Sequence, residues 1–162
     1  MVNTRKVTGR RKLRFENFSA ALREAESLAA AEQAGTLRAL GNWTLGQAIG
    51  HLAFWADAPF DGYPDMPPLP WLLRVVVTLF KTPILNRGIP AGGRIPSIPG
   101  GTFGVDVLPT NEAMARLRRA FDRLAVKQPT HPNPVFGMMS HADWIKMNLR
   151  HAELHLGFFV PA

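Results

Sequence analysis

Proline is distributed very unevenly along this chain. Ten of its fourteen prolines, and seven of its fourteen glycines, lie in the segment of residues 59–109. Proline removes a backbone donor and clashes with the preceding helical turn, and glycine favours turns, so this segment cannot be mainly regular helix or sheet. Regular structure is therefore expected before and after it, with an irregular crossover between the two parts.

Both flanks carry patterns typical of amphipathic helices, in which apolar residues recur every three or four positions. Thr44 and Ser140 are good N-cap residues, and Pro59 is expected to end the second helix. Strand signals are almost absent. The four expected helices cover residues 15–34, 44–58, 110–124 and 140–156. Two helix pairs joined by a long crossover predict an all-α fold, a four-helix bundle.

The length of 162 residues fits one domain. We expect a tail of residues 1–14 and a single domain of residues 15–162 that includes the crossover, residues 59–109. Within the crossover, residues 71–80 (WLLRVVVTLF) are apolar but too short to span a bilayer. This segment would fold back on the domain, form a lid, or form the contact of a homodimer.

The net charge of +7 belongs to the tail. Six of the nineteen Lys and Arg residues lie in the first fourteen positions, which hold no Asp or Glu. From residue 15 onward, 13 basic residues face 12 acidic ones. The domain has no basic excess that would indicate a nucleic-acid partner. The tail is expected to be solvated and partly disordered, or else to meet phosphate or an anionic membrane surface.

The chain contains no cysteine, which excludes disulfides and thiolate ligands. No apolar stretch after the tail resembles a signal-peptide core, because residues 15–34 carry charges throughout. A cytoplasmic location is expected. Any metal ion must be held by histidine and carboxylate side chains.

Two of the five histidines, His151 and His155, lie four positions apart on the last expected helix. Their side chains are about one turn apart on one face, close enough to hold one ion. On a helical wheel Trp144 and Met147 share this face. Asp143, Lys146, Arg150 and Glu153 form an opposite strip that we assign to solvent.

A third ligand is expected from His51 on the second helix, where Trp55 and Gln47 share its face. Gln47 would bond a ligand ring or a metal-bound water, or be a buried amide between helices. Asn148 is a candidate partner for a buried imidazole. The predicted metal ligands are therefore His51, His151 and His155. The residues expected around them are Gln47, Trp55, Trp144, Met147 and Asn148.

The remaining candidates are weaker. His131 lies among prolines and is expected at the surface or at the mouth of the site, and His141 near its rim. No carboxylate faces inward as a general base, and no residue is singled out as catalytic. The His-Glu-x-x-His motif of metallopeptidases is absent, so peptidase chemistry is not expected.

Several motifs together resemble the DinB/YfiT-like superfamily of metalloenzymes. They are WTLGQ at residues 43–47 with His51, and HAELHL at residues 151–156. A narrower likeness, to an uncharacterised-domain branch, rests on RRKLRF at 10–15, DG at 61–62, HP at 131–132 and FG at 136–137. The resemblance covers nearly the whole chain. It implies a four-helix bundle that holds a divalent metal at His51, His151 and His155.

The resemblance implies less about the reaction. Characterised members include S-transferases and isomerases that use a low-molecular-weight thiol, whose pKa the metal lowers. We therefore expect an enzyme that depends on Zn or Ni and carries out thiol transfer or hydrolysis on a small molecule. The alternative is a non-catalytic bundle that binds a small apolar ligand or acts in a stress response.

Overall fold

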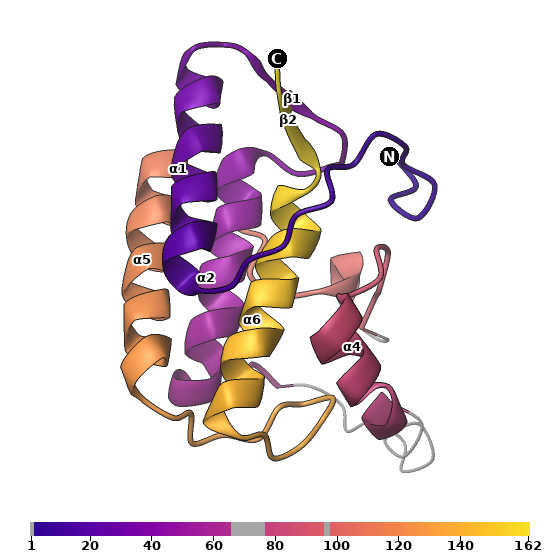
Figure 1. Cartoon of the computed structure of the whole chain (residues 1–162), viewed down its shortest axis with the longest axis vertical. Coiled ribbons are helices and arrows are strands. Elements are labelled where there is room, and N and C mark those ends of the chain that lie inside the picture. The colour runs from indigo at the N-terminus through magenta and orange to yellow at the C-terminus, as the bar shows by residue number, and fades with distance from the viewer. Residues whose placement is uncertain (1, 66–76, 96–97) are drawn as a thin grey trace.

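Four long helices form the body of the protein. The computed structural model describes residues 2–65, 77–95 and 98–162. The four helices lie side by side, and α2 contacts both α5 and α6 (Figure 1). Their bounds are α1 (Phe18–Gln33), α2 (Leu45–Asp61), α5 (Thr110–Val126) and α6 (His141–Leu156). The prediction of a mainly helical chain is confirmed.

Polar caps begin three of these helices. The Asn17 side chain accepts from the amide of Ala20 at the start of α1, and Ser140 accepts from Asp143 at the start of α6. Thr44 and Gln47 form a reciprocal capping box, in which each side chain accepts from the other residue's backbone N–H. The caps satisfy amides that have no partner within the helix.

The prediction that Pro59 ends the second helix is wrong, because α2 continues to Asp61. Proline removes one hydrogen bond within the helix but leaves the amides beyond it free to continue, as the bond from Gly62 N to Ala58 O shows. Pro59 is fully buried, and its carbonyl accepts from the backbone N–H of His131. Tertiary packing therefore holds this last turn in place.

A small antiparallel sheet, which the sequence did not predict, accompanies the helices. Strand β1 (Leu37–Ala39) follows α1, and β2 (Phe159–Pro161) follows α6. Each strand has only three residues, too few for apolar and polar residues to show a clear alternation. Their pairing depends on the helices, which bring the end of the chain beside the connection between α1 and α2.

The apolar faces of the four helices meet in one core. Leu28, Ile49, Leu117 and Leu156 are fully buried, one on each long helix. Burial of such a side chain contributes about 1.5–3 kcal/mol. The core thus fixes how α2 and α6 face each other.

The N-terminal segment, residues 2–17, crosses α6 (Figure 1). Arg11 N donates to Gly157 O, and the backbone of Phe15 bonds two side chains of α6. Its N–H donates to Glu153 Oε1 at 2.7 Å, and its carbonyl accepts from Arg150 Nη2 at 2.8 Å. The assignment of Arg150 and Glu153 to solvent is therefore wrong. Both are buried, because the N-terminal segment covers this face.

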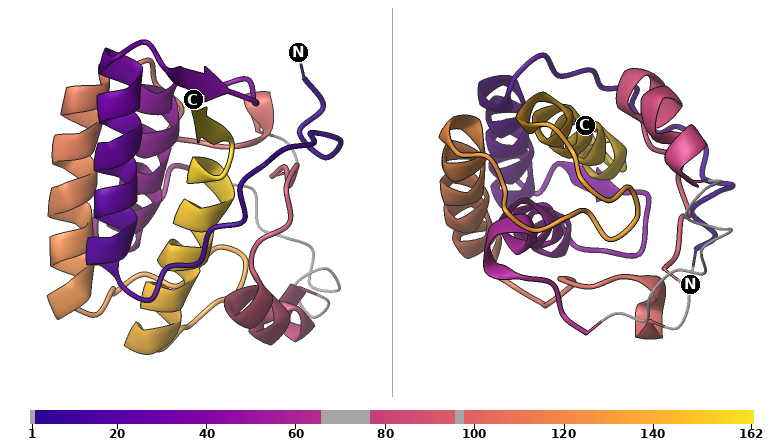
Figure 2. Two further views of the ribbon diagram at one scale, coloured as in Figure 1. Left: turned by 45° about the horizontal axis from the view of Figure 1, so that its top comes forward. Right: turned by 90° about the horizontal axis from the view of Figure 1, so that it is seen from below.

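The crossover carries a short helix, α4 (Lys81–Arg87), and a 3-10 turn, η1 (Pro99–Gly101). Helix α4 lies outside the group of four long helices, on the side of α6 (Figure 2). There Lys81 pairs with Asp143 of α6 at 2.7 Å. Of the apolar segment 71–80, residues 71–76 lie outside the described residues, and Leu79 and Phe80 are exposed. Dimerisation through this segment stays a prediction.

Among the helices that the structure describes, none is both long and apolar enough to cross a lipid bilayer.

Candidate metal centre

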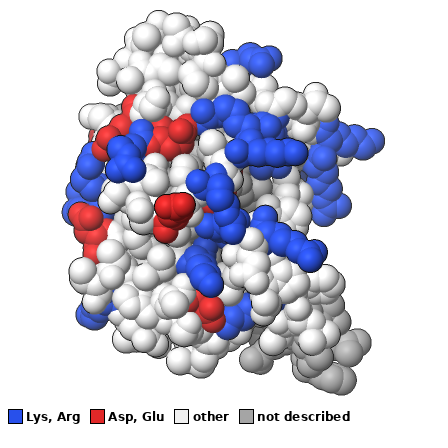
Figure 3. Space-filling model, viewed as in Figure 1, with Lys and Arg blue, Asp and Glu red and all other residues white. Residues whose placement is uncertain are grey.

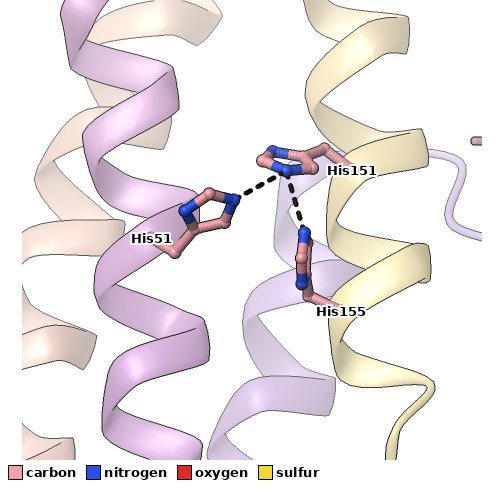
Figure 4. A group of neighbouring side chains, drawn as sticks. All are labelled: His51, His151 and His155. Carbon is pink, nitrogen blue, oxygen red and sulfur yellow. Dashed lines mark hydrogen bonds between the residues drawn. The ribbon is translucent and has the colours of Figure 1, made fainter. Parts of the chain in front are cut away.

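Three histidine rings from two helices meet at one point (Figure 4). His51 extends from α2, and His151 and His155 extend from successive turns of α6. The Nε2 atom of His151 lies 3.2 Å from that of His51 and 3.0 Å from that of His155. The ligand atoms of all three rings lie within 4.8 Å of one another. The structure thus brings together the three histidines that the sequence singled out.

A backbone carbonyl orients the His51 ring. Nδ1 of His51 lies 2.8 Å from the carbonyl oxygen of Phe103, in the crossover. A carbonyl only accepts, so Nδ1 must carry the proton, and Nε2 of the neutral ring presents a lone pair to the other two histidines. Metal-binding histidines are commonly held this way. The sequence could not reveal this contact, because any residue supplies a carbonyl.

No assignment of protons lets both contacts of His151 Nε2 be hydrogen bonds. A neutral ring nitrogen carries either one proton or one lone pair. His51 Nε2 carries a lone pair, so a hydrogen bond between it and His151 requires that His151 Nε2 donates. His151 Nε2 then has no lone pair to accept a hydrogen bond from His155. If His151 instead accepts from His155, two lone pairs face each other across 3.2 Å. A cation between the rings would satisfy all three lone pairs at once.

The distances also fit one ion. Imidazole nitrogens bind zinc at about 2.0–2.1 Å, which places two ligands about 3.4 Å apart at tetrahedral corners and about 3.0 Å at adjacent octahedral corners. The two contacts, 3.2 and 3.0 Å, lie in this range. The distances therefore agree with three nitrogens on one divalent ion.

Burial keeps the rings neutral. It lowers the pKa of His51 to about 4, while the bond to Phe103 acts in the opposite direction. The pKa values of His151 and His155 lie well below the usual value, first because of burial and then because a charge on one ring would repel a charge on the next, with Arg10 adding to this at His155. At neutral pH, protons therefore do not compete with a metal ion for these nitrogens.

Two tryptophans border the histidines. Trp43 stacks on His155, with ring centroids 5.1 Å apart and an interplanar angle of 12°, and it also contacts His51. Trp55 meets His51 edge-on at 6.2 Å. Trp55 was expected here from the helical wheel. Trp43 was not expected, because it precedes the N-cap of α2 and so does not appear on the helical wheel. Its place directly before that N-cap is the sequence feature that could have pointed to it.

The other four residues expected around the site make contacts with other groups. The Gln47 side chain donates from Nε2 to Val105 O, and its Oε1 accepts from Thr44 N in the capping box. Trp144 is buried in the core, and Asn148 donates to the carbonyl of Trp144. Met147 packs against the core while partly exposed. In the described part of the chain, no hydrogen bond or ring contact joins these four to the histidines.

The remaining histidines are tied to backbone carbonyls at the opposite end of the long helices. The His131 ring bonds Pro59 O, and the His141 ring bonds Leu124 O. No Asp or Glu of residues 2–65, 77–95 and 98–162 joins the three-histidine group. Although Glu153 is buried, its carboxylate is bonded to Phe15 and Arg150.

No curated protein and no solved structure matches the chain. One family model covers nearly all of it, from residue 7 to residue 162, and therefore includes all three histidines. The chain belongs to that family, which is described as "Protein of unknown function (DUF1569)".

Proposed function

We propose that this protein is a divalent-metal-dependent enzyme with His51, His151 and His155 as its metal ligands. The observation that carries the proposal is that His151 Nε2 lies 3.2 Å from His51 Nε2 and 3.0 Å from His155 Nε2, although a neutral ring nitrogen can make only one of these two hydrogen bonds. Three further features support it: the rings are neutral, the Phe103 carbonyl accepts from His51 Nδ1, and two tryptophans border the rings. The proposal includes membership of the DinB/YfiT-like superfamily and its four-helix bundle, which the shared motifs support.

A set of three protein ligands favours a reactive site over a structural one. Structural zinc sites are closed by four protein ligands, whereas three leave a position for water or substrate. When bound, a divalent ion such as Zn or Ni would act as a Lewis acid and lower the pKa of a coordinated thiol or water. His151 and His155 are partly exposed, so a small molecule can approach from their side.

The surrounding residues have distinct tasks in this proposal. The Phe103 carbonyl holds the His51 ring in the tautomer that can bind metal, and Trp43 and Trp55 limit the access of water. No carboxylate in the described residues is placed to act as a base. We therefore favour transfer of a low-molecular-weight thiol, or hydrolysis, over chemistry that needs a separate carboxylate base.

The test is metal analysis of protein purified without a histidine tag. The wild type should hold about one equivalent of divalent metal, because three neutral imidazoles converge on one point. The His151→Ala, His155→Ala double variant should hold almost none, since one histidine alone binds weakly. Inductively coupled plasma mass spectrometry measures both.

His131→Ala is the matched control, because it removes a histidine that lies outside the group. This variant should keep the wild-type metal content. If wild type and double variant hold equally little metal after incubation with Zn or Ni, the proposal fails. The non-catalytic small-ligand module then becomes the better explanation.

A further inference from the structure

Arg10 lies beside the end of α6 that carries His155. Its Nη2 donates to the carbonyl of Leu154, the residue directly before His155, at 3.1 Å. Its guanidinium carbon lies 4.1 Å from the centre of the Phe158 ring. The N-terminal segment thus brings a cation to the end of the helix that holds two of the three histidines.

Arg10 differs from the other two arginines nearest to it in the segment. Arg11 pairs with Glu24, and Arg14 pairs with Glu153. No carboxylate of the described residues forms an ion pair with Arg10. Its buried Nε has no hydrogen-bond partner, as is also the case for Arg11, so the difference between the two arginines is the missing ion pair. A guanidinium without an anionic partner can bind an anion that approaches its outer N–H groups.

The charge of Arg10 acts on the metal centre. It is one of the causes that lower the pKa of His155, after burial and the two neighbouring histidines. Lys and Arg side chains also gather on the face where the N-terminal segment crosses α6 (Figure 3). An anion that approaches His155 on this side would meet a positive potential.

We propose that Arg10 binds the carboxylate of the molecule that occupies the metal centre, so that the substrate is a small anion. This inference rests on the proposed function. The Nη atoms of a guanidinium lie in one plane, and the N–H groups that Leu154 O leaves unused match the oxygens of a carboxylate. One unpaired guanidinium supplies one positive charge, which suits a singly charged group.

A purely structural role for Arg10 would be to hold the N-terminal segment on α6 through Leu154 O. The two roles differ in their effect on ligand choice. A structural role affects charged and neutral ligands alike, whereas a binding role affects only the charged ligand. The test therefore compares two small thiols of similar size, mercaptoacetate and 2-mercaptoethanol.

Each thiol is titrated into protein loaded with Co²⁺, and the thiolate-to-cobalt absorption reports binding. We expect the wild type to bind mercaptoacetate at least tenfold more tightly than 2-mercaptoethanol. Arg10→Gln should reduce this ratio about tenfold and leave 2-mercaptoethanol binding unchanged. Because a carboxylate also binds cobalt directly, the change in the ratio is the decisive quantity.

Lys12→Gln is the matched control, because it removes one exposed positive charge from the same segment. It should keep the wild-type ratio, and Arg10→Lys should restore part of it. Equal ratios in wild type and Arg10→Gln, with cobalt bound to both, would overturn the role of Arg10 and leave the metal centre standing. If the wild type binds no cobalt, the proposed function fails and this inference with it.

Discussion

His51 shows how much of a residue's chemistry is decided by one contact. The side chain is almost fully buried, and its only hydrogen-bonded neighbours among the described residues are Phe103 O and His151. The carbonyl accepts a hydrogen bond from Nδ1–H, the one N–H of the neutral ring, and the lone pair on Nε2 then faces α6. A histidine at the same position without Phe103 could adopt either tautomer.

Acid should destabilise the metal-free protein through His51. The pKa of His51 is about 4 in the folded chain and near 6.5 in the unfolded chain, so between these values the unfolded chain binds more protons. The free energy of unfolding should therefore fall as pH drops from about 6.5 to 4, by about 3 kcal/mol from this group. Urea unfolding of chelator-treated protein at each pH measures it.

The variant His51→Gln should lose this part of the pH dependence, because glutamine does not titrate. His131→Gln, outside the three-histidine group, should keep it. An unfolding free energy that is flat between pH 6.5 and 4 in the wild type would show that His51 is not held neutral by burial.

At the scale of elements, two sides of α6 make different contacts. One side presents His151 and His155, and another presents Arg150 and Glu153 to the N-terminal segment. The helical wheel found the first surface correctly and misassigned the second. A wheel places charged residues on the solvent side because most of them are exposed; it cannot include a segment from elsewhere in the chain that covers them.

Removing Arg150 should be costly. Its ion pair with Glu153 at 3.1 Å is buried, with side-chain exposures of 5% and 8%. Its loss leaves the Glu153 carboxylate with only the exposed Arg14, 3.6 Å away, as an ion-pair partner. We expect Arg150→Ala to lower the free energy of unfolding by about 3 kcal/mol. Thermal or urea unfolding measures the change.

Arg118→Ala is the comparison, since the Arg118–Glu26 pair is about half exposed. Its loss should cost less than about 1 kcal/mol. If both variants lose the same small amount, the N-terminal segment does not depend on the buried pair.

At the scale of the whole molecule, segments distant in the sequence lie against the three histidines or the helix that carries them. The crossover supplies Phe103 O to His51, and the N-terminal segment supplies Arg10 beside His155. The crossover returns to the body at Leu108, directly against the first turn of α2. A close approach there keeps Phe103 within reach of His51.

Gly46 makes this close approach possible. A side chain at this position would meet the backbone oxygen of Leu108, which cannot move without the crossover. We expect Gly46→Ala to destabilise the fold by about 1–3 kcal/mol and to weaken metal binding, because Phe103 would shift. Unfolding experiments and metal titration measure the two effects.

Gly93→Ala is a suitable control, because a side chain there has open space around it. It should change neither stability nor metal affinity. A Gly46→Ala variant as stable as the wild type would show that the crossover does not pack closely against α2.

The sequence by itself determined the four long helices, two of their caps and the three histidines that meet, because these depend on residues a few positions apart. The tertiary structure alone decided the two strands, the continuation of α2 past Pro59, the burial of Arg150 and Glu153, and the contacts of Phe103, Trp43 and Arg10. Each of these depends on which distant segments come together. Which segments come together depends on how the apolar surface of the whole chain is buried, and a pattern of a few neighbouring residues carries no information about that.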